Sequence, residues 1–182
     1  MADTLSAKTT IEFAATYSQP MDSGVSKWTP TVTSQRSWAD GTGTGAAQDV
    51  FCVSRTIAAA AFENLDLTAL VQDDAAAATV RTVVFVQIKA ILIRNTTAAG
   101  TGGYLTVGGG TNCGGAADAW VGTAGQGWLK DDTDLLYIPN DSEICMTFSP
   151  GVTVTNTDAD VLGLGATTQN QTYTIMILGD TA

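Results

Sequence analysis

The feature that most constrains the fold is the run of residues 80–94, which is rich in β-branched and other apolar side chains. One alternating set along this run is Val84, Val86, Ile88, Ala90 and Leu92. Alternation at a period of two predicts a β-strand, and the length of the run predicts a central strand that faces a core on one side. We expect residues 104–107 to return as its hairpin partner after a loop at 95–103.

Shorter runs of the same kind fill the rest of the chain, and turn residues separate them about every 10 to 15 positions. The expected strands are 9–17, 49–55, 135–138, 143–148, 152–154, 162–164 and 173–177, with turns at 139–142 and 150–151. Residues 56–62 favour helix by their alanine content, whereas the period-two pair Leu65 and Leu67 favours strand, the interpretation adopted here. The pattern predicts an all-β, antiparallel β-sandwich, jelly-roll-like, with under about 15% helix.

The N-terminal region differs from the remainder. Residues 1–48 are expected to form an extended arm and loop region, and residues 49–182 the β-sandwich domain, because Pro and Gly interrupt the first part and residues 40–47 have a loop composition. The candidate interface residues are Ile11, Phe13, Trp28 and Trp38. Tryptophan is frequent at interfaces. The alternative is that each tryptophan fills the core of its own domain, which we favour for Trp120.

Charge excludes several partners. The chain has 18 acidic and 8 basic residues, no cluster of basic ones and a formal net charge of −10. We therefore expect no direct nucleic-acid partner and no anionic membrane surface. The apolar run 83–93 is interrupted by Gln87 and Lys89, so no membrane span is expected. Three widely spaced cysteines and a start without a signal sequence predict folding in a reducing cytoplasm without disulfides.

The chemistry of the chain points away from catalysis because it contains no histidine. The triad Asp131, Asp132 and Asp134 has the spacing of calcium ligands, but it lacks the pattern of an EF-hand and is better explained as a solvated turn. The cysteines Cys52 and Cys145 are expected in the core, and Cys113 in an exposed glycine-rich loop. We expect no enzymatic activity, no cofactor and no metal.

Four segments carry a resemblance to a known group of proteins: Leu-Asp-Leu-Thr-Ala-Leu at 65–70, Val-Gln-Ile-Lys-Ala-Ile-Leu-Ile-Arg-Asn at 86–95, Tyr-Leu-Thr-Val-Gly-Gly at 104–109, and Tyr-Thr-Ile-Met-Ile-Leu-Gly at 173–179. With this hydrophobic skeleton, residues 65–179, about three fifths of the chain, resemble virion structural proteins of tailed bacteriophages. The group usually has Pro-Gly-Gly where this chain has Pro139-Asn140-Asp141. The resemblance implies a scaffold without catalytic residues.

The resemblance implies that the protein is part of a virion and that it is made in the host bacterial cytoplasm. Because an acidic inner surface would repel packaged DNA, we expect an outer capsid decoration or cement subunit of the head. Its partners would be the major capsid protein and copies of itself, with a trimer favoured. The alternatives are a tail or fibre protein that binds a host carbohydrate receptor, a single jelly-roll capsid-forming protein, and a carboxylate-dependent enzyme.

Overall fold

The computed structural model describes residues 4–21, 24–74, 79–108, 135–155 and 160–182. The regular structure of these residues consists of β-strands, most of which pair antiparallel. No described residue lies in a helix, as the sequence predicts. No helix of this described part is long and apolar enough to cross a membrane.

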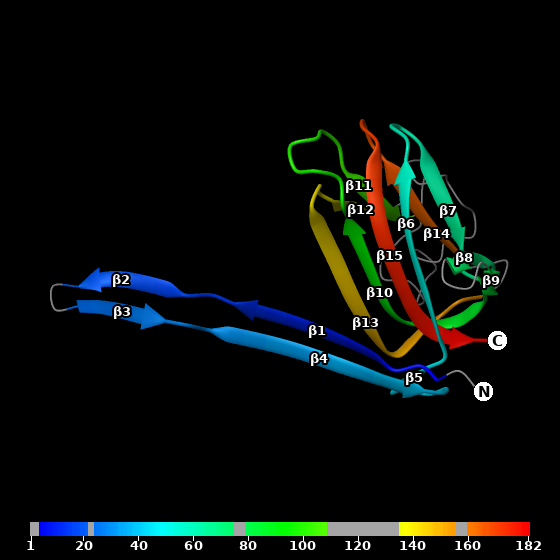
Figure 1. The fold of residues 1–182 in the computed structure, drawn as a ribbon, viewed down its shortest axis with the longest axis horizontal. Coiled ribbons are helices and arrows are strands. Elements are labelled where there is room, and N and C mark those ends of the chain that lie inside the picture. The colour runs from blue at the N-terminus through cyan, green and yellow to red at the C-terminus, as the bar shows by residue number, and fades with distance from the viewer. Residues whose placement is uncertain (1–3, 22–23, 75–78, 109–134, 156–159) are drawn as a thin grey trace.

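Two four-stranded antiparallel sheets form the body of the molecule (Figure 1). The first sheet has the order β13 (Ser142–Thr153), β10 (Phe85–Asn95), β15 (Gln171–Thr181) and β6 (Asp49–Ile57). The second sheet has the order β12 (Leu135–Ile138), β11 (Leu105–Gly108), β14 (Val161–Ala166) and β7 (Phe62–Asp66).

The core is one buried cluster to which both sheets contribute. Its members from the first sheet include Phe51, Ile57, Ile88, Ile91, Ile93, Tyr173, Ile175 and Ile177. Its members from the second sheet include Leu65, Leu105, Val107, Ile138, Leu162 and Leu164. Burial of this apolar surface is the main stabilising term of the body.

The predicted central strand is interior in the first sheet, but its expected facing is wrong. The pairing of β10 shifts register between Ile88 and Ala90, the mark of a β-bulge. Beyond the bulge the alternation changes phase, so Ile91 and Ile93 enter the core while Leu92 lies on the opposite face. The expected hairpin partner is also wrong, because residues 105–108 lie in the second sheet as β11.

Two further expectations about turns are corrected or refined. Pro150 and Gly151 do not turn the chain, because β13 continues through them to Thr153. The alanine-rich stretch is neither a helix nor a continuous strand: β6 ends at Ile57, a turn follows, and β7 begins at Phe62. The turn predicted at 139–142 is present, with Asp141 in the left-handed region at a φ of 54°.

The N-terminal strands form a long hairpin that projects from one corner of the first sheet (Figure 1). In it β1 (Ala7–Ala14) pairs with β4 (Thr31–Asp40), and β2 (Tyr17–Met21) pairs with β3 (Gly24–Trp28). We call this hairpin, β1 to β4, the arm. At its base β4 pairs in parallel with β5 (Ala46–Ala47). A second hairpin, β8 (Leu70–Asp74) with β9 (Thr79–Val83), lies beside β6.

Candidate interaction surface at the arm

The base of the arm packs on the outer face of the first sheet, the face that points away from the core. Trp38 of β4 is only 2% exposed and forms a second buried cluster with Ala47, Ala90 and Leu178. Ala90 and Leu178 are cross-strand neighbours on β10 and β15. The arm is thus attached to the body by the apolar packing of Trp38 against β10 and β15.

A buried lysine adds a polar connection at the same place. The ammonium of Lys89 lies 3.1 Å from the Asp180 carboxylate and donates hydrogen bonds to the carbonyl oxygens of Gly43 (3.0 Å) and Pro150 (2.7 Å). It also donates to the side chain of Gln87. Gly43 belongs to the loop between β4 and β5, so one lysine joins the base of the arm to β10, β13 and β15. The sequence shows Lys89 as a charged residue inside an apolar run. That position indicates a buried lysine, but it does not identify the partners of the ammonium.

Two buried polar atoms near this attachment have no hydrogen-bond partner among the described residues, Trp38 Nε1 and Asp180 Oδ1. An unsatisfied buried group costs about 1–3 kcal/mol. Hydrogen bonding of the buried polar atoms is therefore less complete at the base of the arm than in the core that the two sheets share.

Cross-strand rows order the outer face of the first sheet. The covered row, under the base of the arm, runs Thr147, Ala90, Leu178 and Val50. The next row, which we call the apolar row, runs Cys145, Leu92, Met176 and Cys52. The polar row beyond it runs Glu143, Arg94, Thr174 and Ser54. The apolar surface of this sheet thus extends one row beyond what the arm covers.

Three members of the apolar row, Cys145, Leu92 and Met176, line a groove of about 640 Å³ between β1 and the first sheet, and Cys52 lies at the end of the row beside Met176. Ile11 and Trp38 line it from the arm, and Leu92, Met176 and Leu178 line it from the sheet. Ile11 is 47% exposed and Met176 43% exposed, so large apolar side chains on both sides of the groove face solvent. Exposed apolar surface of this kind favours an interaction surface over a purely solvated face.

The outer edge of β6 is protected by side chains from the β8–β9 hairpin. Arg81 donates to the carbonyl oxygen of Val50 (2.8 Å), and the backbone N–H of Cys52 donates to the Gln72 side chain (3.0 Å). Arg81 also forms an ion pair with Asp49. Because these groups occupy backbone positions that another strand would need, addition of a strand to this edge is disfavoured.

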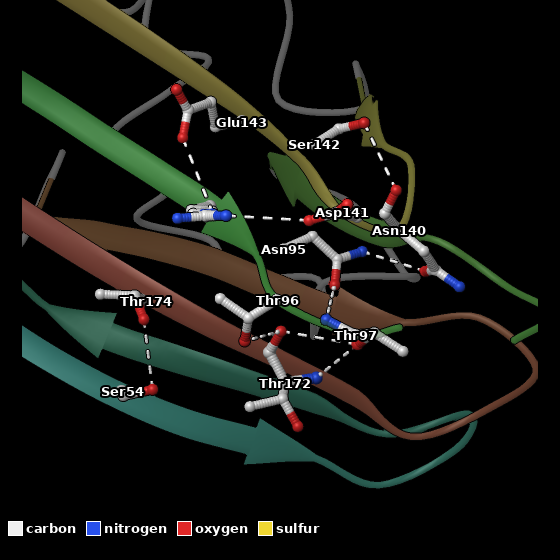
Figure 2. Close-up of polar contacts among 11 residues, drawn as sticks. Ser54, Asn95, Thr96, Thr97, Asn140, Asp141, Ser142, Glu143, Thr172 and Thr174 are labelled. Carbon is white, nitrogen blue, oxygen red and sulfur yellow. Dashed lines mark hydrogen bonds and ion pairs between the residues drawn. The ribbon is translucent and has the colours of Figure 1, made fainter. Parts of the chain in front are cut away.

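A polar network fixes the loops at the far end of the body (Figure 2). The buried amide of Asn95 lies within hydrogen-bond distance of Ile138 O, Asn140 Oδ1 and Gln171 Oε1 and accepts a hydrogen bond from the N–H of Thr97. The Thr172 carbonyl accepts a hydrogen bond from the N–H of Thr96. The partners of Asn95 are side-chain amides and backbone groups that hold the loops in place, and the exposed ion pairs of Arg94 with Asp141 and Glu143 lie beside them.

Between the two sheets, Glu63 of β7 accepts a hydrogen bond from the Tyr173 hydroxyl (2.8 Å) and forms an ion pair with Arg55 of β6. Burial, and then the neighbouring Glu63 carboxylate, raise the pKa of Tyr173 well above its ordinary value. The phenol therefore stays protonated, which suits a structural link between β15 of the first sheet and β7 of the second and does not suit a nucleophile.

The predicted interface residues occupy different places in the arm. Ile11 is exposed on β1, and Trp38 is buried within its own chain at the attachment. Phe13 lies in β1 opposite Val32, and Trp28 lies in β3 opposite Tyr17; the side chains of both are outside the described residues.

The cysteine prediction is wrong for the two cysteines that the structure describes. Cys52 is exposed and Cys145 half-buried, and both lie on the outer face of the first sheet instead of in the core. Asp131, Asp132, Asp134, Cys113 and Trp120 lie outside the described residues. Within the described part, no group of three or more acidic or cysteine side chains is placed to hold a metal ion.

Comparison of the chain with protein-family models, with curated proteins and with solved structures finds no match.

Proposed function

We propose that this protein is a non-enzymatic structural subunit that works by assembly through its arm. The observation that carries the proposal is the arm itself, a two-stranded hairpin that extends away from the body with exposed Ile11 and Val32. A two-stranded hairpin alone is at best marginally stable in water, and a third strand or another surface stabilises it. A partner protein supplies such a surface.

The assembly that we propose is a bacteriophage virion, with the protein as an outer decoration or cement subunit bound to the major capsid protein. The resemblance of residues 65–179 to virion structural proteins supports this placement. The acidic balance supports an outer position, because 18 carboxylates against 8 basic groups oppose contact with packaged DNA. A trimer is the favoured form, since it matches threefold positions on an icosahedral shell.

We also propose that the two sheets pack as a β-sandwich with jelly-roll topology. Support comes from the strand order: with the β8–β9 hairpin set aside, successive described strands from β6 to β15 alternate between the sheets, except for β11 and β12, which are neighbours. Eight strands in two sheets connected in this way are typical of a jelly roll. The shared buried cluster is consistent with packing of the two sheets face to face.

A shortened arm tests the capsid proposal without disturbing the attachment. Thr10 and Gln35 are direct partners in the β1–β4 pair, so residues 11–34 can be replaced by an Asn-Gly turn. This variant keeps Trp38, Gly43 and Ala47. We expect it to fold with an unchanged circular dichroism spectrum and to lose at least tenfold in affinity for capsids in a co-sedimentation assay. Equal affinity of the two proteins for capsids would contradict the proposal.

A further inference from the structure

We infer that the groove beside the apolar row receives the distal part of the arm, β2 and β3, from a second copy of this chain. The inference rests on the proposed function and deepens it, because it names both the surface and its occupant. The groove is open to solvent along Met176 and Ile11, and it continues an apolar surface that the chain's own arm already covers at Trp38. A second arm would extend that contact by one row of the sheet.

The dimensions of the arm favour a neighbour over its own body. From Ala7 to Met21 the hairpin spans about 50 Å at the rise of an extended strand, whereas β10 spans about 35 Å. The arm also points away from the body (Figure 1), so its distal strands do not lie on their own sheet. Across the described residues, the main contacts of β2 and β3 are with each other.

Charge selects the arm as the part of a second copy that can approach this groove. Residues 1–40 contain four acidic and three basic side chains, whereas residues 41–182 contain fourteen acidic and five basic ones. Contact between two bodies therefore brings two strongly acidic surfaces together, and contact between an arm and a body does not. Near the groove, Glu12 and Glu143 offer carboxylates to the exposed Lys27 of an incoming β3.

The geometry of such a contact is heterologous, because the arm and the groove are different surfaces of the same chain. Contacts of this kind close into rings when the rotation between copies permits it, and a ring of three is the trimer favoured above. The protected outer edge of β6 agrees with this arrangement, since it leaves the outer face of the sheet, and not that edge, as the surface for a partner.

Substitution in the groove is the first part of the test. Met176→Glu adds a carboxylate to the apolar row at an exposed position, and we expect it to weaken self-association at least tenfold in sedimentation velocity. The matched control, Val80→Glu, makes a comparable change at a side chain that is 68% exposed on the β8–β9 hairpin, and we expect less than a twofold effect. Circular dichroism checks that both variants fold.

Cross-linking between copies is the second part. One pool of the full chain carries Ser18→Cys, at the exposed position opposite Lys27 in the β2–β3 pair, with its native cysteines replaced by serine, and a second pool carries Cys52 as its sole cysteine. After mixing, a bis-maleimide reagent should join them at least five times more efficiently than it joins the first pool to a chain whose sole cysteine is Tyr137→Cys, on β12 of the second sheet.

The outcomes separate the two proposals. If the full chain is monomeric at all concentrations, self-association through the arm fails and this inference fails with it. If the chain associates but Met176→Glu matches Val80→Glu, or Cys52 and Tyr137→Cys cross-link equally well, the groove is not the acceptor and only this inference is overturned.

Discussion

Lys89 Nζ lies 3.1 Å from Asp180 Oδ2, and the two side chains are 1% and 9% exposed. The pair joins neighbouring strands of the first sheet at the point where the arm is attached, because the same ammonium binds the carbonyl oxygen of Gly43. Removal of a charge from the water is costly, and removal of one partner of a buried pair leaves the other uncompensated. The attachment of the arm therefore depends on both charges.

The first prediction concerns this pair. Lys89→Met or Asp180→Asn should each lower the free energy of unfolding by about 3–5 kcal/mol. The double variant Lys89→Met with Asp180→Leu should recover most of that loss, because no buried charge remains. Denaturant titration measures all three. Arg94→Met is the control, since its ion pairs are half exposed and should contribute less than about 1 kcal/mol.

A second prediction concerns Gly179, which lies next to the bulge of β10. A Cβ atom at this position would lie 2.2 Å from the carbonyl oxygen of Gln87 and 2.9 Å from Phe85. Because backbone must move to relieve this contact, Gly179→Ala should lower the melting temperature and cost about 1–3 kcal/mol. Gly45→Ala, where a Cβ meets nothing within 4 Å, should change the stability by less than about 1 kcal/mol. Similar losses in the two variants would contradict the prediction.

The third prediction is an alkaline dependence of stability. The pKa of Tyr173 is raised in the folded protein, so its full contribution to stability is present below the ordinary tyrosine pKa of about 10. Above that pH the unfolded state loses the proton first, and stability should fall by up to about 1.4 kcal/mol per pH unit from this residue. Denaturant titrations from pH 8 to 11 should give a steeper fall for the native chain than for Tyr173→Phe. Identical slopes would show that the hydroxyl does not titrate abnormally.

A fourth prediction compares two thiols on the same sheet face. Burial, and secondarily Glu143, raise the pKa of Cys145, so less of its reactive thiolate is present near neutral pH. In protein dilute enough to be monomeric, iodoacetamide should modify exposed Cys52 several times faster than Cys145, as followed by peptide mass spectrometry. Glu143→Gln should accelerate the reaction of Cys145 a few-fold and leave the rate at Cys52 unchanged. A faster reaction at Cys145 than at Cys52 would contradict this account.

Much of the strand content follows from local patterns in the sequence. Strands 135–138 and 143–148 and the alternating apolar residues Tyr173, Ile175 and Ile177 are where the period of two places them, with the last three in the core. These predictions succeed because one buried face per strand imposes strict alternation.

The wrong predictions concern residues whose position depends on contacts between strands that are far apart in the sequence. A bulge after Ile88 changes which residues of β10 face the core, and it depends on pairing with β13 and β15, which no local pattern encodes. The attachment of the arm was missed for the same reason, because Lys89 and Asp180 are far apart in sequence and only the sheet brings them together. Trp38 was predicted as an interface residue, and in the structure it is buried against its own chain, whereas the side chain of Trp28 lies outside the described residues.

The central claim is that the arm drives assembly, and the molar mass of the protein in solution tests it most directly. Light scattering coupled to size exclusion should give the mass of a trimer for the full chain, about three times 18.7 kDa. The variant in which Asn-Gly replaces residues 11–34 should elute as a folded monomer. A full chain that stays monomeric at every concentration, or a shortened chain that assembles as fully as the native one, would contradict the account.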